Sequence, residues 1–183
     1  MQWTIPGTVL RIDRDNADGV EEMFSSMFLA GGMVLSQVAS ITGLEPYTVQ
    51  NWVKRGFLSP PKNKRYTLQQ LCRILHINML KEVMPLERIC SLLRYINGKL
   101  DQEDDDIIDD AALYFLFVRL AARAKELYDV QERKALLKAI LEEYDAPVPG
   151  AKERVEKALQ IMLTAWLAAR MGQEAERMML ELE

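Results

Sequence analysis

A signal that ends a helix and a signal that begins one lie close together in the first half of the chain. The segment VLSQVASITG places apolar residues on one helical face and ends at Gly43, a residue type that commonly ends helices. Pro46 follows after a very short turn and suits the first position of a new helix. The second segment, PYTVQNWVKR, puts Val49 and Trp52 on one face and stops at Gly56. The pattern predicts a helix-turn-helix unit whose second helix covers residues 46–55.

The residues after this unit predict a short wing or loop and then two more helices. Pro60 and Pro61 forbid helix, and a basic segment follows over 62–66. Thr67 and Gln70 form a capping-box pattern at the start of a helix over 68–83. Pro85 then starts another helix that ends at Asn97-Gly98.

The rest of the chain also has helical rather than strand periodicity. EEMFSSMFL predicts an amphipathic helix near the N-terminus, and apolar patterns predict helices near 104–128, 130–144 and 151–181. Strand-like alternation is confined to the region of the wing. We therefore predict an all-α fold with three parts: a helical N-terminal extension (1–33), the helix-turn-helix module (34–98) and a C-terminal helical bundle (99–183).

Composition narrows the class of protein. The chain of 183 residues is 49% hydrophobic and 27% charged, as soluble globular proteins are. Its longest apolar run, 111–118, is too short to cross a bilayer, and the N-terminus lacks the features of a targeting peptide. Two cysteines without a secretory signal fit a reducing compartment. We expect a cytoplasmic protein that does not enter a membrane.

Charge is strongly segregated along the sequence. The formal net charge is −4, yet residues 44–100 carry ten Lys or Arg against three Glu. Residues 101–110 (DQEDDDIIDD) hold seven acids and no base. A basic module in an acidic chain is typical of an anion-binding face. The acidic stretch is either a solvated helix start or a segment that repels DNA or folds back on the basic module.

The module resembles the winged helix-turn-helix of the MerR family of bacterial transcription regulators. The resemblance rests on GLEPYTVQNWVKRGFLSPP, on RYTLQQLCRI and on MPLERICSLL, with their Gly, Pro, Trp and Leu positions in the family's spacing. It covers about a third of the chain. The chain as a whole is similar to uncharacterised bacterial proteins that join such a module to a helical C-terminal half.

The resemblance implies double-stranded DNA as the partner, with helix 46–55 in the major groove and wing 62–66 on the phosphate backbone. Gln and Asn can pair with adenine, whereas hydroxyls and basic groups reach phosphates. The expected DNA-binding residues are Tyr47, Thr48, Gln50, Asn51, Lys54, Arg55, Lys62, Lys64, Arg65 and Tyr66. Trp52 is expected in the core.

No pattern of residues indicates an enzyme, a cofactor or a metal site. The phosphate-binding and nucleophile-elbow motifs are missing, and His76 is the only histidine. Cys72 and Cys90 have no further Cys or His at zinc-ligand spacing, so we expect both thiols to be buried small hydrophobes. MerR-like metal sensors use C-terminal cysteines, and none follows Cys90. We expect catalytic residues, cofactors and metals to be absent.

The C-terminal half contains helices that are apolar around most of their circumference. Val155, Leu159, Met162 and Trp166 follow 4-3-4 spacing, which suits a helix–helix seam. A homodimer fits, because helix-turn-helix proteins commonly bind paired half-sites. Tyr114, Phe115, Phe117 and Trp166 are candidates to line an effector pocket, although core packing explains them equally.

The predicted function is that of a DNA-binding transcriptional regulator with a C-terminal domain for dimerisation and a small-molecule or protein effector. Two alternatives stay open at this stage. One is a protein-interaction scaffold that uses the fold without DNA. The other is a nucleoid-anchoring protein that contacts phosphates with little readout of bases.

Overall fold

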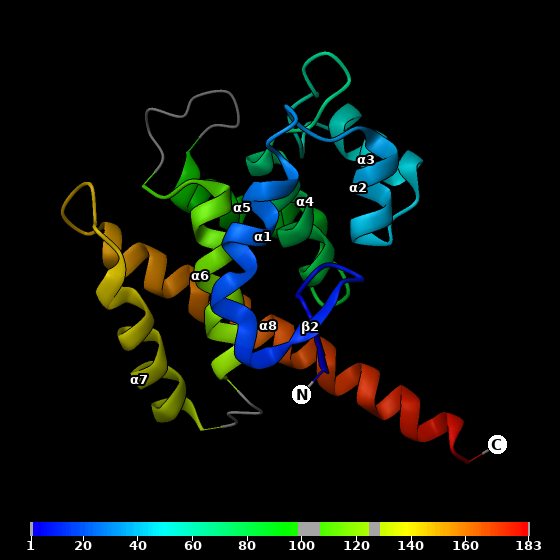
Figure 1. Cartoon of the computed structure of the whole chain (residues 1–183). Helices are drawn as coiled ribbons and strands as arrows, with labels where there is room; N and C mark the ends of the chain where they lie inside the picture. The colour runs from blue at the N-terminus through cyan, green and yellow to red at the C-terminus, as the bar shows by residue number, and fades with distance from the viewer. Residues whose placement is uncertain (1, 99–106, 125–128, 183) are drawn as a thin grey trace.

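The structure, a computed structural model, describes residues 2–98, 107–124 and 129–182. These residues form a mostly helical protein with eight α-helices and one two-stranded hairpin (Figure 1), which confirms the predicted helical class. Among these helices, none is both long enough and apolar enough to span a membrane. The elements are β1 (Gln2–Thr4), β2 (Arg11–Asp13), the 3-10 helix η1 (Arg14–Gly19), α1 (Val20–Met27), α2 (Leu35–Thr42), α3 (Pro46–Lys54), α4 (Leu68–Leu80), α5 (Leu86–Asn97), α6 (Asp110–Arg123), α7 (Val130–Ile140), the 3-10 turn η2 (Leu141–Glu143) and α8 (Ala151–Leu180).

The first residues contain strands that the sequence did not predict. β1 and β2 pair antiparallel, with Trp3 opposite Ile12. Each strand has only three residues, so neither is long enough to produce a readable alternation of apolar and polar side chains. The N-terminal extension thus contains this hairpin in addition to the predicted amphipathic helix, which is present as α1.

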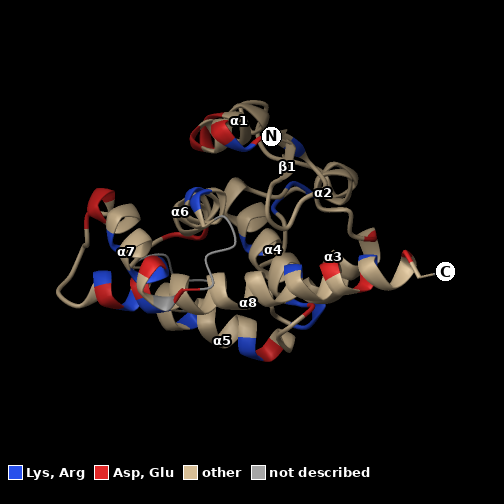
Figure 2. Cartoon of the chain, turned by 90° about the horizontal axis from the view of Figure 1, so that it is seen from below, with Lys and Arg blue, Asp and Glu red and all other residues tan. Residues whose placement is uncertain are grey.

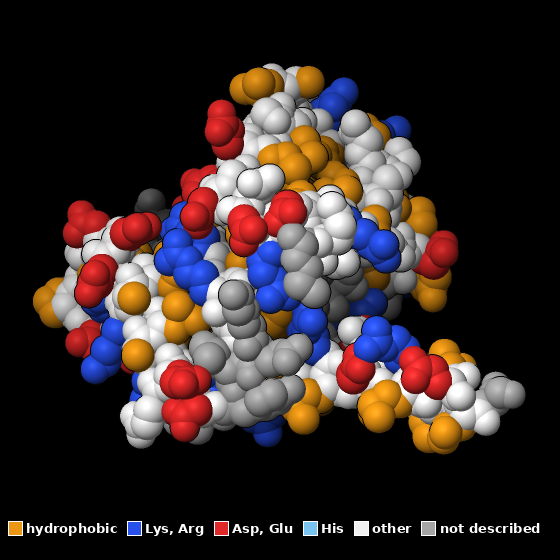
Figure 3. All heavy atoms as spheres, turned by 60° about the horizontal axis from the view of Figure 1, so that its bottom comes forward, with side chains coloured by type: hydrophobic (Ala, Val, Ile, Leu, Met, Phe, Trp, Pro, Cys, Tyr) orange, Lys and Arg blue, Asp and Glu red, His pale blue; other side chains and the backbone are white. Residues whose placement is uncertain are grey.

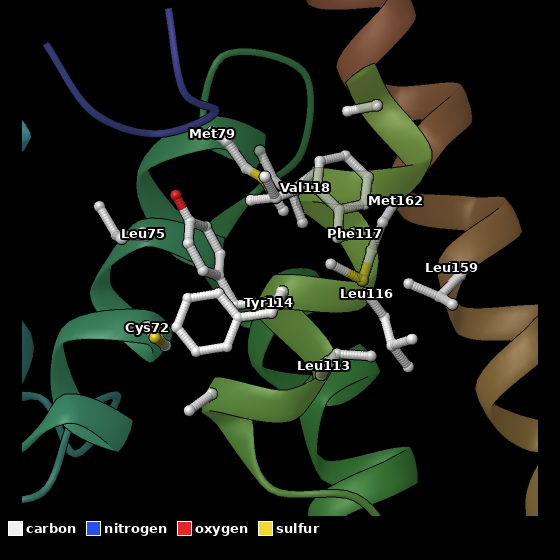
Figure 4. Packing of buried hydrophobic residues seen from close by; sticks show 14 of the residues in the cluster. Cys72, Leu75, Met79, Leu113, Tyr114, Leu116, Phe117, Val118, Leu159 and Met162 are labelled. Carbon is white, nitrogen blue, oxygen red and sulfur yellow. The ribbon is translucent and has the colours of Figure 1, made fainter. Parts of the chain in front are cut away.

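Helix α6 lies at the centre of the core. It buries ten of its fourteen residues, because it packs against α4 on one side and α8 on another. Figure 4 shows the Tyr114 ring against Cys72 and Leu75 of α4, while Leu116 and Phe117 face α8. Residue 98 is the predicted boundary between the helix-turn-helix module and the C-terminal half. Helix α6 therefore connects α4 of the expected module to the C-terminal half.

The N-terminal segment is fixed onto the same core. The Tyr114 hydroxyl donates to the Pro6 carbonyl at 2.7 Å. Gly7 has φ +75°, and a Cβ there would lie 2.5 Å from the Leu75 carbonyl oxygen. The Asn78 amide donates to the carbonyls of Gly7 and Thr42. These contacts hold the loop after β1 between α4 and the end of α2.

Helix α6 begins later than predicted. Residues 107–109 are not helical and Asp110 is the first helical residue, whereas we expected a start near 104. Asp109 provides the cap, since its side chain accepts from the backbone N–H groups of Ala111 and Ala112 at 2.8 and 2.9 Å. The prediction for 104–106, and most of the acidic run (101–106), lies outside the described residues, as do residues 125–128.

Helix α8 has a buried part and an exposed part. The expected seam of Val155, Leu159, Met162 and Trp166 is buried within the chain, where α8 crosses α4, α5, α6 and α7. Every residue of 170–182 is exposed. We call residues 170–182 the α8 arm, which extends past the body of the molecule in Figure 1.

Candidate nucleic-acid interface

The turn between α2 and α3 has the predicted geometry. Gly43 adopts the left-handed conformation with φ 69°, and its N–H donates to the Ala39 carbonyl. Pro46 occupies the first turn of α3. Val49 and Trp52 are buried, at 0% and 2% exposure, and fix α3 to the core. The placement of Trp52 in the core is thus confirmed.

The opposite side of α3 faces outward. The Tyr47 side chain is 70% exposed, and Thr48 is half-buried. Because Val49 and Trp52 point inward, the intervening polar side chains are turned to the surface. The exposed predicted residues on and just after this helix are Tyr47, Gln50, Asn51, Lys54 and Arg55.

The wing is a tight two-residue turn. Lys62 and Arg65 pair in an antiparallel bridge, with the Arg65 N–H donating to the Lys62 carbonyl at 2.9 Å. Asn63 and Lys64 both have positive φ, at 51° and 60°, which is the backbone that connects strands with the correct twist. The turn leaves Lys62, Lys64 and Arg65 exposed.

Tyr66 differs from the other predicted contacts because it is buried. It is 3% exposed, and burial raises the pKa of its phenol. Its backbone N–H and carbonyl pair with Met33 at 2.7 and 3.0 Å. Tyr66 therefore anchors the base of the wing, and its side chain is not part of the outer surface.

The exposed basic residues fall into two groups. Arg55 forms an ion pair with Glu87 at 2.8 Å and lies 4.5 Å from the centre of the Phe57 ring, and Arg65 donates to the Gly32 carbonyl. The side-chain ammonium groups of Lys54, Lys62 and Lys64 form no hydrogen bond or ion pair with any residue that the structure describes. These three lysines, which we call the free lysines, are available to bind an external anion.

A groove of about 550 Å³ lies between α2, α3 and the wing. Sequence reasoning missed the contribution of α2, and no local signal could reveal it, because only the fold brings residues 34–36 beside the wing. Polar groups from all three elements share the groove with apolar ones. It is lined by Val34, Leu35, Ser36, Gln50, Val53, Pro61, Lys64 and Tyr66.

A buried polar cluster lies behind this face, between α4 and α6. Arg73 pairs with Asp110 at 3.1 Å and donates through Nε to the Phe57 carbonyl. Burial alone would raise the pKa of Asp110, but His76 and Arg73 outweigh it and the pKa is lowered. Asp110 thus joins the acidic run to the basic module through a buried contact away from the exposed face of α3.

Both cysteines are buried, as predicted, and His76 is buried as well. His76 is fully buried, with Nδ1 at 3.7 Å from Asp110 Oδ1, and burial lowers its pKa. Cys72 and Cys90 are buried free thiols, and burial raises the pKa of both. Across the described residues, His, Cys, Asp and Glu nowhere gather in a group of three that could hold a metal ion.

Comparisons with known proteins find a match for part of the chain. Residues 33–117 match the family model of a domain of unknown function, DUF1836. The matched segment begins two residues before α2 and ends within α6, so it includes residues from both sides of the α4–α6 contact. The chain is also 29% identical over 84 residues to the uncharacterized protein YkrK of Bacillus subtilis (strain 168). That alignment covers 44% of this chain and 36% of YkrK. No solved structure matches the chain.

Proposed function

We propose that the chain binds double-stranded DNA through α3 and the wing and acts as a transcriptional regulator. The observation that carries the proposal is the position of the free lysines. Lys54 lies at the end of α3, and Lys62 and Lys64 lie in the wing. Gln50 of α3 and Lys64 of the wing line one groove, so the two elements form one surface.

The chemistry of this surface suits a duplex. The outward side chains of α3 would enter the major groove, where Gln50 and Asn51 can pair with adenine edges. Tyr47, Thr48 and the free lysines would contact phosphates and set the register. Arg55 and Arg65 stay on the surface and would add charge, although each already has an internal partner.

A second copy of the chain is the proposed partner of the α8 arm. Met171, Met178 and Leu182 are 56%, 59% and 80% exposed and recur at helical spacing. In Figure 3 several apolar side chains of the arm lie on its lower side, and charged side chains lie on its upper side. Because no residue that the structure describes covers Met171, Met178 and Leu182, a second arm is a suitable cover.

The charges of the arm favour an antiparallel pair. Figure 2 shows basic and acidic residues in alternation toward the end of α8. Arg170, Glu174, Arg177 and Glu181 alternate in sign. Aligned antiparallel about residues 175 and 176, two arms bring Glu174 level with Arg177 of the partner subunit. Such a dimer would present two α3 helices to paired half-sites.

The dimer is tested by light scattering after size-exclusion chromatography. Wild type is expected at twice 21.0 kDa, and Met178→Glu/Leu182→Glu at 21.0 kDa. A wild-type monomer at concentrations that support DNA binding contradicts the dimer. An unchanged mass in the variant would remove the arm from the interface.

The groove supports a second candidate function, that of a protein-interaction module. Val34, Leu35, Val53 and Pro61 give it an apolar wall that could hold a side chain of a partner protein. Nucleoid anchoring is a third possibility, in which the free lysines bind phosphates without base readout. A DNA-binding experiment with matched variants separates these three candidate functions.

The experiment is fluorescence anisotropy with a labelled random duplex of about 30 base pairs, a length that accommodates two half-sites. Wild type is compared with Lys54→Gln/Lys62→Gln/Lys64→Gln. The control is Lys134→Gln/Lys138→Gln/Lys152→Gln, which removes the same charge from exposed positions on α7 and α8.

DNA binding predicts loss in the first variant only. Equal loss in both variants would indicate attraction by overall charge, and no binding by wild type at low salt would favour the protein-interaction module. Asn51→Ala then separates regulation from anchoring. The substitution should relax preference for a selected duplex in a regulator and leave an anchor unaffected.

A further inference from the structure

A second cavity, of about 340 Å³, lies away from α3 and the wing. Its walls come from the loop after β1, the turn between α2 and α3, the C-terminal end of α4, and α8. Its volume falls in the range of pockets that bind small molecules. The cavity therefore borders the α2–α3 turn together with the N-terminal loop, the end of α4 and α8.

Two cations of this cavity form no ion pair with a residue that the structure describes. Lys81 follows the last residue of α4, and Arg170 is the first residue of the α8 arm. No carboxylate among the described residues lies within ion-pair distance of either. The Arg170 guanidinium instead lies 4.9 Å from the centre of the Trp166 ring, which positions it over an apolar surface.

Several other polar groups of the cavity are engaged in hydrogen bonds within the protein. The Asn78 amide donates to the carbonyls of Gly7 and Thr42, and the Thr8 hydroxyl donates to the Ile5 carbonyl. Glu82 accepts from the Gln173 amide at 2.9 Å. The walls are thus held by internal hydrogen bonds, and Lys81 and Arg170 are the charged groups left for a ligand.

We propose that this cavity binds a small organic anion, whose carboxylate or phosphate is held between Lys81 and Arg170. Burial lowers the pKa of Lys81 and only Glu82 opposes this effect, so a bound anion would supply the compensating charge that the amine lacks. Trp166 provides an apolar surface for the rest of the ligand. This site does not depend on the proposed DNA binding.

The ligand would connect parts of the protein that are distant in sequence. It would contact the turn at Gly43-Leu44, which orients α3, and the base of the α8 arm, which we propose pairs with a second copy. An anion in this cavity is therefore positioned to couple the α2–α3 unit to the arm.

The test is isothermal titration calorimetry of the full chain without DNA, with citrate and inorganic phosphate as separate probes at constant ionic strength. We expect saturable binding of citrate, phosphate or both, with a Kd of about 1 mM or below. The stronger probe identifies the anionic group. Lys81→Gln and Arg170→Gln should each weaken binding by about tenfold, because each loses a charge-assisted contact.

Two further variants make the result specific to this cavity. Glu82→Gln removes a negative charge from the wall and should tighten binding. Arg177→Gln, on the exposed arm beyond the cavity, should leave binding unchanged. Circular dichroism confirms that each variant is folded.

Two results would overturn the proposal. One is no saturable binding of either anion by wild type. The other is equal binding by wild type and the folded Lys81→Gln and Arg170→Gln variants, which would place the anion elsewhere. Because no DNA is present, a failure here is distinct from a failure of DNA binding.

Discussion

The basic residues of the α4–α6 contact and those of the α3–wing face differ in what surrounds them. Arg73 is 5% exposed and paired with Asp110, so its charge is used inside the protein to join two halves of the core. Lys54, Lys62 and Lys64 are exposed and have no partner among the described residues. The net positive charge of residues 44–100 therefore combines structural cations with cations that remain available for a ligand. Environment, rather than residue type, separates the two uses.

The largest expected effect comes from breaking the buried pair. Arg73→Leu leaves the Asp110 carboxylate without its partner and should lower the free energy of unfolding by about 3–5 kcal/mol. Urea unfolding followed by circular dichroism measures this change. The double variant Arg73→Leu/Asp110→Leu should cost less than Arg73→Leu alone, because it leaves no uncompensated charge. A double variant that is less stable than the single one would refute the pairing argument.

The pH dependence of stability provides a second test of the buried α4–α6 contact. Burial lowers the pKa of His76, and Arg73 adds to this effect while Asp110 opposes it. The unfolded chain therefore takes up the His76 proton first as the pH falls. The contribution of neutral His76 to the free energy of unfolding is complete above about pH 6.5. It is lost as the pH drops from there through the folded-state pKa of His76.

Urea unfolding at pH 7 and pH 5 tests this sign. The wild type should lose stability with a slope of up to about 1.4 kcal/mol per pH unit. His76→Phe should flatten the slope in this window, since His76 is the only histidine. An unchanged slope in His76→Phe would mean that other groups cause it.

The wing offers a change with opposite effects on stability and binding. Lys64 has φ 60°, a conformation that costs a non-glycine residue about 1 kcal/mol. Lys64→Gly should raise the free energy of unfolding by up to this amount and weaken DNA binding, because it removes a free lysine. Asn63→Gly is the matched control, with relief of the same kind and no loss of charge. Thermal unfolding and anisotropy measure the two effects, and unweakened DNA binding by Lys64→Gly would count against the wing.

The smallest expected effect is at the exposed pair. Glu87→Gln removes the ion-pair partner of Arg55, but the side chains of Arg55 and Glu87 are well exposed, at 44% and 65% respectively. The stability cost should be below about 1 kcal/mol. DNA affinity should rise, since Arg55 is released and a negative charge near α3 is removed. A cost as large as that of Arg73→Leu would erase the proposed difference between the two regions.

Local sequence signals predicted the elements of the candidate site well. Gly43 and Pro46 define the turn through backbone preferences, and the Thr67 and Gln70 capping box is formed as the pattern indicates. The burial of Trp52 followed from helical periodicity. These features depend on residues only a few positions apart, so a sequence contains enough information to find them.

Features that depend on distant contacts escaped prediction. The buried position of Tyr66 follows from its pairing with Met33, and the ion pair of Arg55 requires Glu87 of the next helix but one. The cavity at Lys81 and Arg170 brings together residues from α4 and α8. No local pattern reports such partners, which explains why the sequence located the face but did not distinguish its free lysines from its engaged arginines.

The most direct test of the account is the salt dependence of DNA binding. Each phosphate contact contributes about 0.9 to the slope of log affinity against log salt. Lys54→Gln/Lys62→Gln/Lys64→Gln should therefore reduce the wild-type slope by about 2–3 for each bound subunit, and the control Lys134→Gln/Lys138→Gln/Lys152→Gln should leave it unchanged. An unchanged slope in the first variant, or an equal reduction in both, would contradict the claim that the free lysines of α3 and the wing bind the phosphate backbone.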